Sequence, residues 1–279
     1  MIDAAYDVQI GEKLAEPTTS RPEARSGMLG SMRPVLARVL AALFAAGWIV
    51  FPGFGAIDLS VTWSSEWPQV LEAGWGVFFT VLVGAAFVAL AFRPCSAAPV
   101  AQLAVAALAL AVSVVAGREA PLAWVPVLVA VETLVVAWLA GASWRSWTAS
   151  RGTFRPTLWL AAIGLVPWLA YALDMWAANR DRRPDSDITN GIDHYAVQGA
   201  LGLALAVLPL LAAPRPVLTP LVPVCAGISA AYLGLVSFAW QDAAAGFGRA
   251  WSVAAMVWGL GLVAVSLAAA VRRSHAAIG

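Results

Sequence analysis

The chain alternates between long apolar runs and shorter polar segments. A transmembrane helix needs roughly 20 apolar residues to cross about 30 Å of hydrocarbon, and most of the runs approach or exceed this length. The runs cover approximately residues 35–57, 71–92, 98–116, 121–141, 157–177, 194–213, 217–239 and 250–271. Few residues separate several neighbours, which favours antiparallel hairpins with tight turns. The pattern therefore predicts an all-α fold, a polytopic integral membrane bundle of about eight transmembrane helices.

The polar ends of the chain set the expected boundaries of this bundle. Residues 1–32 mix both charge signs and end in a stretch rich in proline, serine, threonine and arginine, so we expect a mobile cytoplasmic tail. Residues 33–273 form the expected eight-helix transmembrane domain, and residues 274–279 form a short cytoplasmic C-terminal tail. The first apolar run begins only near Val35 and is long enough to span. We interpret it as an uncleaved helix and not as a signal peptide.

Composition supports the membrane assignment. Hydrophobic residues make up 61% of the 279 residues and charged residues 12%, whereas soluble domains are about a quarter charged. A soluble domain of this length cannot hide so much apolar surface, but a bilayer replaces the core as apolar solvent. The formal net charge of +1 gives no field that favours nucleic acid or an acidic substrate as a partner.

Lysine and arginine are distributed unevenly between the two sides of the predicted bundle. Twelve lie on the side of the chain termini and five on the other. Because cytoplasmic loops carry the excess of these residues, both termini are predicted to be cytoplasmic. Arginine outnumbers lysine sixteen to one and alanine is abundant, which is typical of a GC-rich bacterial genome. We therefore expect the chain in a bacterial plasma membrane.

An Arg-Pro pair precedes each outward-running helix. The pairs begin at Arg33, Arg93, Arg155 and Arg215, at intervals of 60, 62 and 60 residues. Proline in a first helical turn loses no hydrogen bond, and arginine there binds anionic headgroups. The period fits four tandem helical hairpins. Any bundle of short-looped hairpins repeats near this length, however, so internal duplication stays open.

The most unusual residue is Glu132, about eleven residues into the fourth run and therefore near the bilayer midplane. A charge at that depth costs on the order of 2.5–3.5 kcal/mol. The functional interpretation is a proton or cation relay or a substrate contact, and the alternative is a protonated glutamate that bridges two helices. The candidate pathway residues, chosen by depth or by position at the outer mouth, are Glu132, Ser229, Tyr232, Gln198 and Asp174.

The densest polar stretch of the membrane part runs from Asp174 to Gln198 and is predicted to lie outside the membrane. Asn190-Gly191 is a turn signal, and Asp193 is placed to cap the helix that follows. The candidate residues of this outer polar loop are Asn179, Arg180, Asp181, Asp187, Asn190, Asp193 and His194. They offer either the mouth of a transport pathway or a surface for a protein partner.

A metal site is the more specific of the interpretations of this loop. The candidate ligands are Asp185, Asp187, Asp193 and His194, which offer carboxylate oxygens and an imidazole. From Asp185, the glycine falls at position seven instead of six and no glutamate stands at position twelve, so the spacing misses the calcium-binding loop. A solvated salt network with the neighbouring arginines, or a partner-binding loop, explains the same residues. No cofactor is therefore predicted, and the metal stays an alternative.

The sequence lacks the motifs of several known classes of enzyme and cofactor-binding protein. The sequence has no His-Glu-x-x-His, no Gly-x-Ser-x-Gly, no phosphate-binding glycine loop and no Cys-x-x-Cys. His194 and His275 are the only histidines, which excludes a bis-histidine haem in the membrane. Lys13 is the only lysine, which excludes a retinal Schiff base inside a helix. These absences weigh against an enzyme.

Three functions from different classes fit these features. The first is a small-solute or ion transporter with Glu132 in its pathway and the outer loop as its mouth. The second is a non-catalytic subunit, sensor or assembly factor that binds a protein partner through the outer loops. The third is a membrane-embedded metal-dependent enzyme. The sequence ranks the transporter slightly above the non-catalytic subunit and both above the enzyme, and it leaves the oligomeric state open.

Overall fold

The computed structural model describes residues 23–141, 155–215, 218 and 220–276. Eight helical segments in these ranges are long and apolar enough to cross a membrane, which confirms the predicted helical membrane bundle. The chain divides into two units, Met1–Met32 and Arg33–Gly279. Helix α1 (Glu23–Ile49) begins in the first unit, within the segment expected to be a tail.

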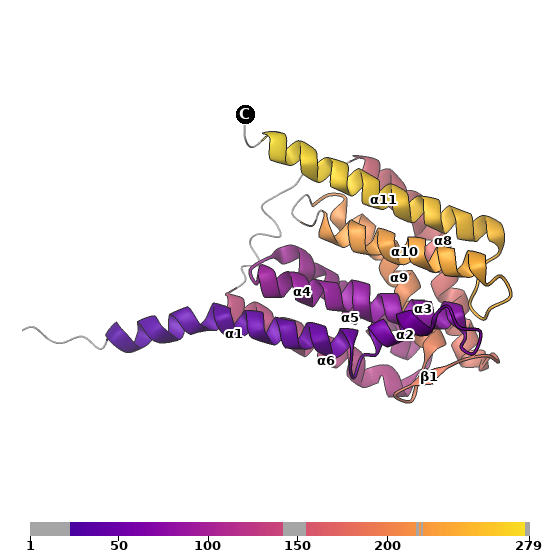
Figure 1. Ribbon diagram of the computed structural model, residues 1–279, viewed down its shortest axis with the longest axis horizontal. Helices are drawn as coiled ribbons and strands as arrows, with labels where there is room; N and C mark the ends of the chain where they lie inside the picture. Colours follow the sequence, from indigo (N-terminus) through magenta and orange to yellow (C-terminus); the bar gives the residue numbers. More distant parts are fainter. Residues whose placement is uncertain (1–22, 142–154, 216–217, 219, 277–279) are drawn as a thin grey trace, which may run out of the picture. The chain divides into compact units, whose positions relative to one another are not determined.

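The remaining spans follow α1 in the order that the apolar runs predict (Figure 1). One continuous span is formed by α3 (Gln69–Val77), the π-helical segment η1 (Phe78–Gly84) and α4 (Ala85–Phe92). The others are α5 (Ala97–Ala116), the short 3-10 turn η2 (Ala120–Ala123) with α6 (Trp124–Ala140), α8 (Arg155–Asp181), α9 (His194–Ala212), α10 (Leu221–Ala239) and α11 (Arg249–Ala276).

Consecutive helices pack as neighbours, with α5 beside α6, α8 beside α9 and α10 beside α11 (Figure 1). The span of α9 is 78% buried, against 22% for the span of α1 and 28% for that of α8, so α9 lies at the centre of the bundle. The peripheral helices turn large apolar side chains outward, for example Trp159, Ile163 and Val166 of α8. Lipid contact requires such a surface.

The first span ends earlier than its apolar run predicts. The run continues to about residue 57, but α1 ends at Ile49 and the chain turns back at Pro52-Gly53. Proline lacks a backbone N–H, and a Cβ on Gly53 would collide with the backbone of Trp48. The apolar residues after this turn form the short helix α2 (Gly55–Val61) instead of prolonging α1.

Several connections meet at one end of the bundle, called here the loop-rich end. They comprise residues 50–68, 117–119, 182–193 and 240–248. Side-chain amides join them: Asn190 Nδ2 donates to the Pro52 carbonyl oxygen at 3.0 Å, and Asn179 Nδ2 donates to the Gly117 carbonyl oxygen at 3.0 Å. The first bond joins two connections that are distant in sequence, and the second joins the end of α8 to the connection after α5.

Candidate metal centre

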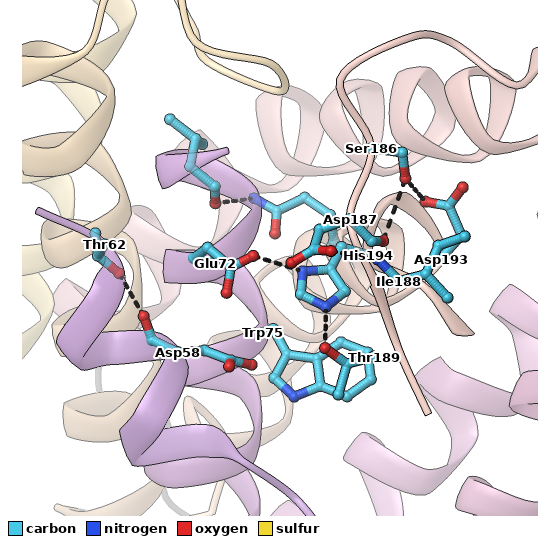
Figure 2. A network of polar contacts seen from close by, with 12 residues as sticks. Asp58, Thr62, Glu72, Trp75, Ser186, Asp187, Ile188, Thr189, Asp193 and His194 are labelled. Carbon is cyan, nitrogen blue, oxygen red and sulfur yellow. Dashed lines mark hydrogen bonds and ion pairs between the residues drawn. The ribbon is translucent and has the colours of Figure 1, made fainter. Parts of the chain in front are cut away.

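Three side chains with metal-ligating groups meet at the loop-rich end. Glu72 comes from the first turns of α3, Asp187 precedes the β-hairpin and His194 opens α9. One ligand atom from each lies within 4.8 Å of the other two (Figure 2). Glu72 and His194 are each 1% exposed, and Asp187 is half-buried. Burying such groups is costly unless they are paired or bind a metal.

The hairpin brings Asp187 to His194. It consists of β1 (Ile188–Thr189) and β2 (Ile192–Asp193). Asn190 (φ 55°) and Gly191 (φ 77°) form its two-residue turn, and two successive positive φ angles are typical of a type I′ turn. The strand register places Asp187 opposite His194, and the His194 N–H donates to the Asp187 carbonyl oxygen at 3.0 Å. The turn signal in the sequence therefore positions two of the three groups.

The His194 imidazole is held on two sides and leaves one nitrogen free. Its Nε2 lies 3.0 Å from Thr189 Oγ1, and the Trp75 ring stacks on it with centroids 4.5 Å apart (Figure 2). Its Nδ1 makes no hydrogen bond and lies 3.4 Å from Glu72 Oε1. In the tautomer with the proton on Nε2, the N–H donates to Thr189 and the Nδ1 lone pair faces Glu72.

The two carboxylates of the cluster differ in their partners. Glu72 Oε1 is buried and has no N–H or hydroxyl donor, although the Glu72 carboxyl is hydrogen-bonded to that of Asp187. Asp187 Oδ1 also accepts from the Ile188 N–H at 2.7 Å. Burial raises the pKa of Asp187, but hydrogen bonding with Glu72 and Ile188 and the nearby His194 outweigh it. They hold that pKa below its ordinary value. Asp187 is therefore an anion at neutral pH.

A further carboxyl group, Asp58 of α2, lies next to the cluster (Figure 2). Asp58 is buried, and its Oδ2 makes no hydrogen bond. Burial, and secondly the negative charge of Asp187, raise the pKa of Asp58 to about 7. Asp58 therefore titrates near neutral pH at the edge of the site.

Asp58→Asn is expected to stabilise the protein at alkaline pH. Because the folded-state pKa is raised from 3.8 to about 7, the stability contributed by the protonated carboxyl is fully present below the unfolded pKa. It is lost as the pH rises through 7. With a chelator present, the melting temperature in detergent should be similar for both proteins near pH 4 and higher for the variant at pH 8. The exposed Asp185→Asn serves as control. Identical melting of Asp58→Asn and wild type at pH 8 would contradict a buried Asp58 with a raised pKa.

The metal ligands predicted from the sequence divide between two roles. Asp187 and His194 belong to the cluster. Asp193 instead caps α9, as its position in the sequence predicts, with Oδ1 accepting from the Tyr195 N–H at 2.9 Å. Asp185 is exposed. The proposed ligand set from the loop alone is thus incomplete.

Glu72 is missing from the ligands predicted from the sequence. Its signal there is an acid near the start of an apolar run, followed by Gly74-Trp75-Gly76. Trp75 is also a site residue that the sequence did not identify, since its ring covers His194 and its indole N–H donates to the Gly53 carbonyl oxygen at 2.8 Å.

The other predicted residues of the outer loop tie the connections together. Asn179 is buried and donates to Glu119 Oε2 at 3.0 Å. Glu119 Oε1 in turn accepts from the Asp193 N–H at 3.3 Å. Arg180 donates to a carbonyl at the end of α5, and Asp181 is exposed. These contacts support the hairpin from the side of α5.

Two of the predicted pathway residues have defined partners. Glu132 is buried in α6, and its Oε2 accepts from the Trp48 indole N–H at 2.7 Å. This bond joins α6 to α1, which is the geometry of the helix-bridging interpretation, and a pathway role for Glu132 stays a prediction. Asp174 is exposed and pairs with Arg183 at 2.8 Å. Exposed ion pairs of this kind contribute little to stability.

The remaining pathway residues lie on the central helices. Gln198 Nε2 donates to the Tyr171 hydroxyl at 2.6 Å. Ser229 is fully buried, and its hydroxyl has no hydrogen-bond partner. Tyr232 packs with its ring edge toward Trp63, with centroids 6.5 Å apart. Gln198 and Ser229 thus bring polar atoms into the core.

The cluster has the donor set of a transition-metal site. One imidazole nitrogen and two carboxylate oxygens are typical ligands of Zn²⁺, Mn²⁺ or Fe²⁺. Three protein ligands leave a coordination position for water or for another ligand. Comparisons of the chain with family models, curated proteins and solved structures give no match.

Proposed function

We propose that this multi-pass membrane protein binds a divalent transition-metal ion, Zn²⁺ or Mn²⁺, through Glu72, Asp187 and His194. The observation that carries the proposal is that the buried atoms Glu72 Oε1 and His194 Nδ1 lie 3.4 Å apart, have no hydrogen bond with each other, and lie within 4.8 Å of an Asp187 carboxylate oxygen. A buried polar atom left unsatisfied costs about 1–3 kcal/mol. A cation between these atoms and Asp187 satisfies both of them and balances the charge of Asp187.

The spacing suits a tetrahedral ion after small side-chain rotations. Ligands about 2.1 Å from such an ion lie ~3.4 Å from one another. The Glu72 and His194 ligand atoms are already 3.4 Å apart, and an Asp187 oxygen lies within 4.8 Å of both. The imidazole favours Zn²⁺ or Mn²⁺ over Ca²⁺ and Mg²⁺, which prefer oxygen ligands alone.

The surroundings of the ligands support the same assignment. Metal-binding histidines generally donate their second ring N–H to a fixed acceptor, and Thr189 Oγ1 fills that place beside Nε2. The Ile188 N–H orients the Asp187 carboxylate. Trp75 covers the imidazole and keeps water from its face. His194 and Asp187 thus each have a neighbour that fixes the direction of the side chain.

We place the site on the extracytoplasmic side of a bacterial plasma membrane. Among the described residues from Arg33 onward, seven arginines lie toward the opposite ends of the helices and five lie at the loop-rich end. Cytoplasmic loops carry the excess of arginine and lysine. The ion then arrives from outside the cell, and the chain termini lie in the cytoplasm.

Elemental analysis of the purified protein tests the proposal. After incubation with zinc or manganese and removal of free ion, the detergent-solubilised wild type is expected to retain about one ion per chain. Chelation should remove the ion and lower the melting temperature, because a ligand that binds only the folded state stabilises it. A wild type that retains neither ion and melts identically with and without chelator would overturn the proposal.

A further inference from the structure

Two ligand atoms of the candidate metal centre are closed off from solvent. Glu72 Oε1 and His194 Nδ1 are both buried, and so are most of the atoms of the two residues. An ion from solution can therefore reach these atoms only when a part of their cover moves. The elements around them are α2, α3, the first turn of α9 and the β-hairpin (Figure 2).

The helices around the site pack closely on one another. A Cβ on Gly76 of α3 would lie 2.6 Å from Leu59 Cγ of α2. On another side of α3, a Cβ on Gly74 would collide with Gln198 Oε1 of α9. Close-packed elements of this kind have no free space in which to shift. Helices α2, α3 and α9 therefore form the fixed part of the cover.

The outer strand and the turn of the hairpin, by contrast, face outward. Ile188 is 64% exposed, and Asn190 and Gly191 are also exposed. We call residues 188–191 the flap. Segments with few buried apolar contacts and with exposed hydrogen bonds open locally at a low cost in free energy. The flap is therefore the part of the cover that opens most easily.

Two hydrogen bonds join the flap and the adjoining Asp187 to the side of the site formed by residues 50–77, within the part of the chain that the structure describes. One lies inside the site, between the carboxyl groups of Glu72 and Asp187. The other runs from Asn190 Nδ2 to the Pro52 carbonyl oxygen at 3.0 Å and is exposed. An ion bound by the two carboxylates replaces the first bond. The second bond contains no ligand atom and is therefore the same with and without the ion.

We propose that the flap gates the metal site and that the hydrogen bond between Asn190 and Pro52 is its latch, an inference that rests on the proposed function. Lifting the flap breaks the latch and the contact between Thr189 Oγ1 and His194 Nε2. Because β1 begins directly after Asp187, lifting also draws that carboxylate away from Glu72. The ion enters through this opening and is enclosed when Asp187 returns.

The latch controls the rates of ion entry and release but not their ratio. It stabilises the closed state equally with and without the ion, and an interaction shifts a binding equilibrium only where it differs between the two states. Loss of the latch should therefore accelerate entry and release by the same factor.

Modification by diethyl pyrocarbonate, which acylates neutral imidazoles, tests the flap without a metal ion. In chelator, the buried His194 of the wild type is expected to react at least about tenfold more slowly than the exposed His275. Asn190→Gly removes the latch and keeps the turn, because glycine adopts the same positive φ. It should make His194 react about fivefold faster, the effect of losing one hydrogen bond, and leave His275 unchanged. Mass spectrometry measures both rates in the same sample.

Two further variants identify the cause of a faster reaction. Asn190→Asp also lacks the donor but tolerates a positive φ, so an equal acceleration excludes the added flexibility of glycine. Gln241→Ala is the matched control. Gln241 Nε2 forms a similarly exposed hydrogen bond to a backbone carbonyl, that of Phe238 at 2.9 Å, but lies outside the flap. This control should leave His194 at the wild-type rate.

Zinc release into an excess of chelator measures the same opening in the loaded protein. The release rate of the wild type is expected to be independent of the chelator concentration, because opening of the flap limits it. Asn190→Gly should release zinc about fivefold faster and bind it with unchanged equilibrium affinity.

The outcomes separate the two proposals. Zinc binding by a wild type in which His194 reacts as fast as His275 overturns the flap and leaves the metal site standing. Wild-type rates in both Asn190 variants, or an equal acceleration in Gln241→Ala, overturn the latch. Absence of zinc binding in the wild type overturns the metal site and the gate for its ion. Faster modification of His194 in the Asn190 variants would then show that the failure lies with the metal and not with the flap.

Discussion

Replacing His194 with alanine is expected to weaken zinc binding by at least about 100-fold, because changing only an outer partner of a ligand already costs about 10–100-fold in affinity. Alanine removes the nitrogen ligand and leaves two carboxylates. Thr189→Val removes only the hydroxyl 3.0 Å from Nε2 and should cause the smaller loss. Competition against a fluorescent zinc chelator measures both affinities on the same scale.

His275→Ala provides the control for this experiment. His275 lies in the last turn of α11, away from the loop-rich end, and its replacement should leave the affinity unchanged. If His194→Ala and His275→Ala bind zinc equally well, His194 is not a ligand.

The same variant distinguishes a metal site from a plain buried ion pair. In an ion pair, loss of His194 leaves the Glu72 charge uncompensated and costs about 3–5 kcal/mol whether or not metal is present. In a metal site, the stability of the wild type itself depends on the ion. Chelation should then bring the melting temperature of the wild type down toward that of His194→Ala. A large difference that persists in chelator would favour the ion pair.

The membrane fold follows from the sequence because the bilayer imposes a length and a polarity on every span. The residue at which the first span ends cannot be predicted in the same way. Ala56 and Ile57 extend the apolar run, but Gly53 packs against the backbone of Trp48 and the chain has already reversed there. A hydropathy average runs across such a turn without detecting it. The end of the helix is set instead by close backbone contacts, such as that between Gly53 and Trp48.

Two of the three candidate ligands are accessible to local reasoning, and the third is not. Asn190-Gly191 predicts a hairpin, and its register sets Asp187 opposite His194. Glu72 joins them only because α3 packs on α9. That contact depends on long-range shape, including the space that Gly74 leaves for Gln198. No local pattern in the sequence encodes it.

Glu132 illustrates the same limit within the membrane. Its depth can be counted from the start of its helix, and its burial agrees with the cost of exposing a carboxyl group to lipid. Its partner Trp48 belongs to a helix distant in sequence. Counting depth places residues at the same level, but it does not show which helices face each other.

The crossing of α10 and α11 depends on two glycines. A Cβ on Gly259 would collide with the Gly227 carbonyl oxygen and lie 2.7 Å from the Ala231 nitrogen, and a Cβ on Gly227 would lie 2.5 Å from the Gly259 carbonyl oxygen. These obstacles are backbone atoms, which cannot rotate away. Small residues let membrane helices approach closely and gain van der Waals contact. The position of α10 therefore depends on this crossing.

Gly259→Ala is expected to force α10 and α11 apart and to destabilise the protein by about 2 kcal/mol or more, the upper range for overpacking. Gly261→Ala is the matched control, because its Cβ would meet only Leu160 at 3.8 Å, an ordinary contact. Alanine also favours helix more than glycine does, so the control should melt at or slightly above the wild-type temperature. If Gly259→Ala melts like Gly261→Ala, the helices do not cross this closely.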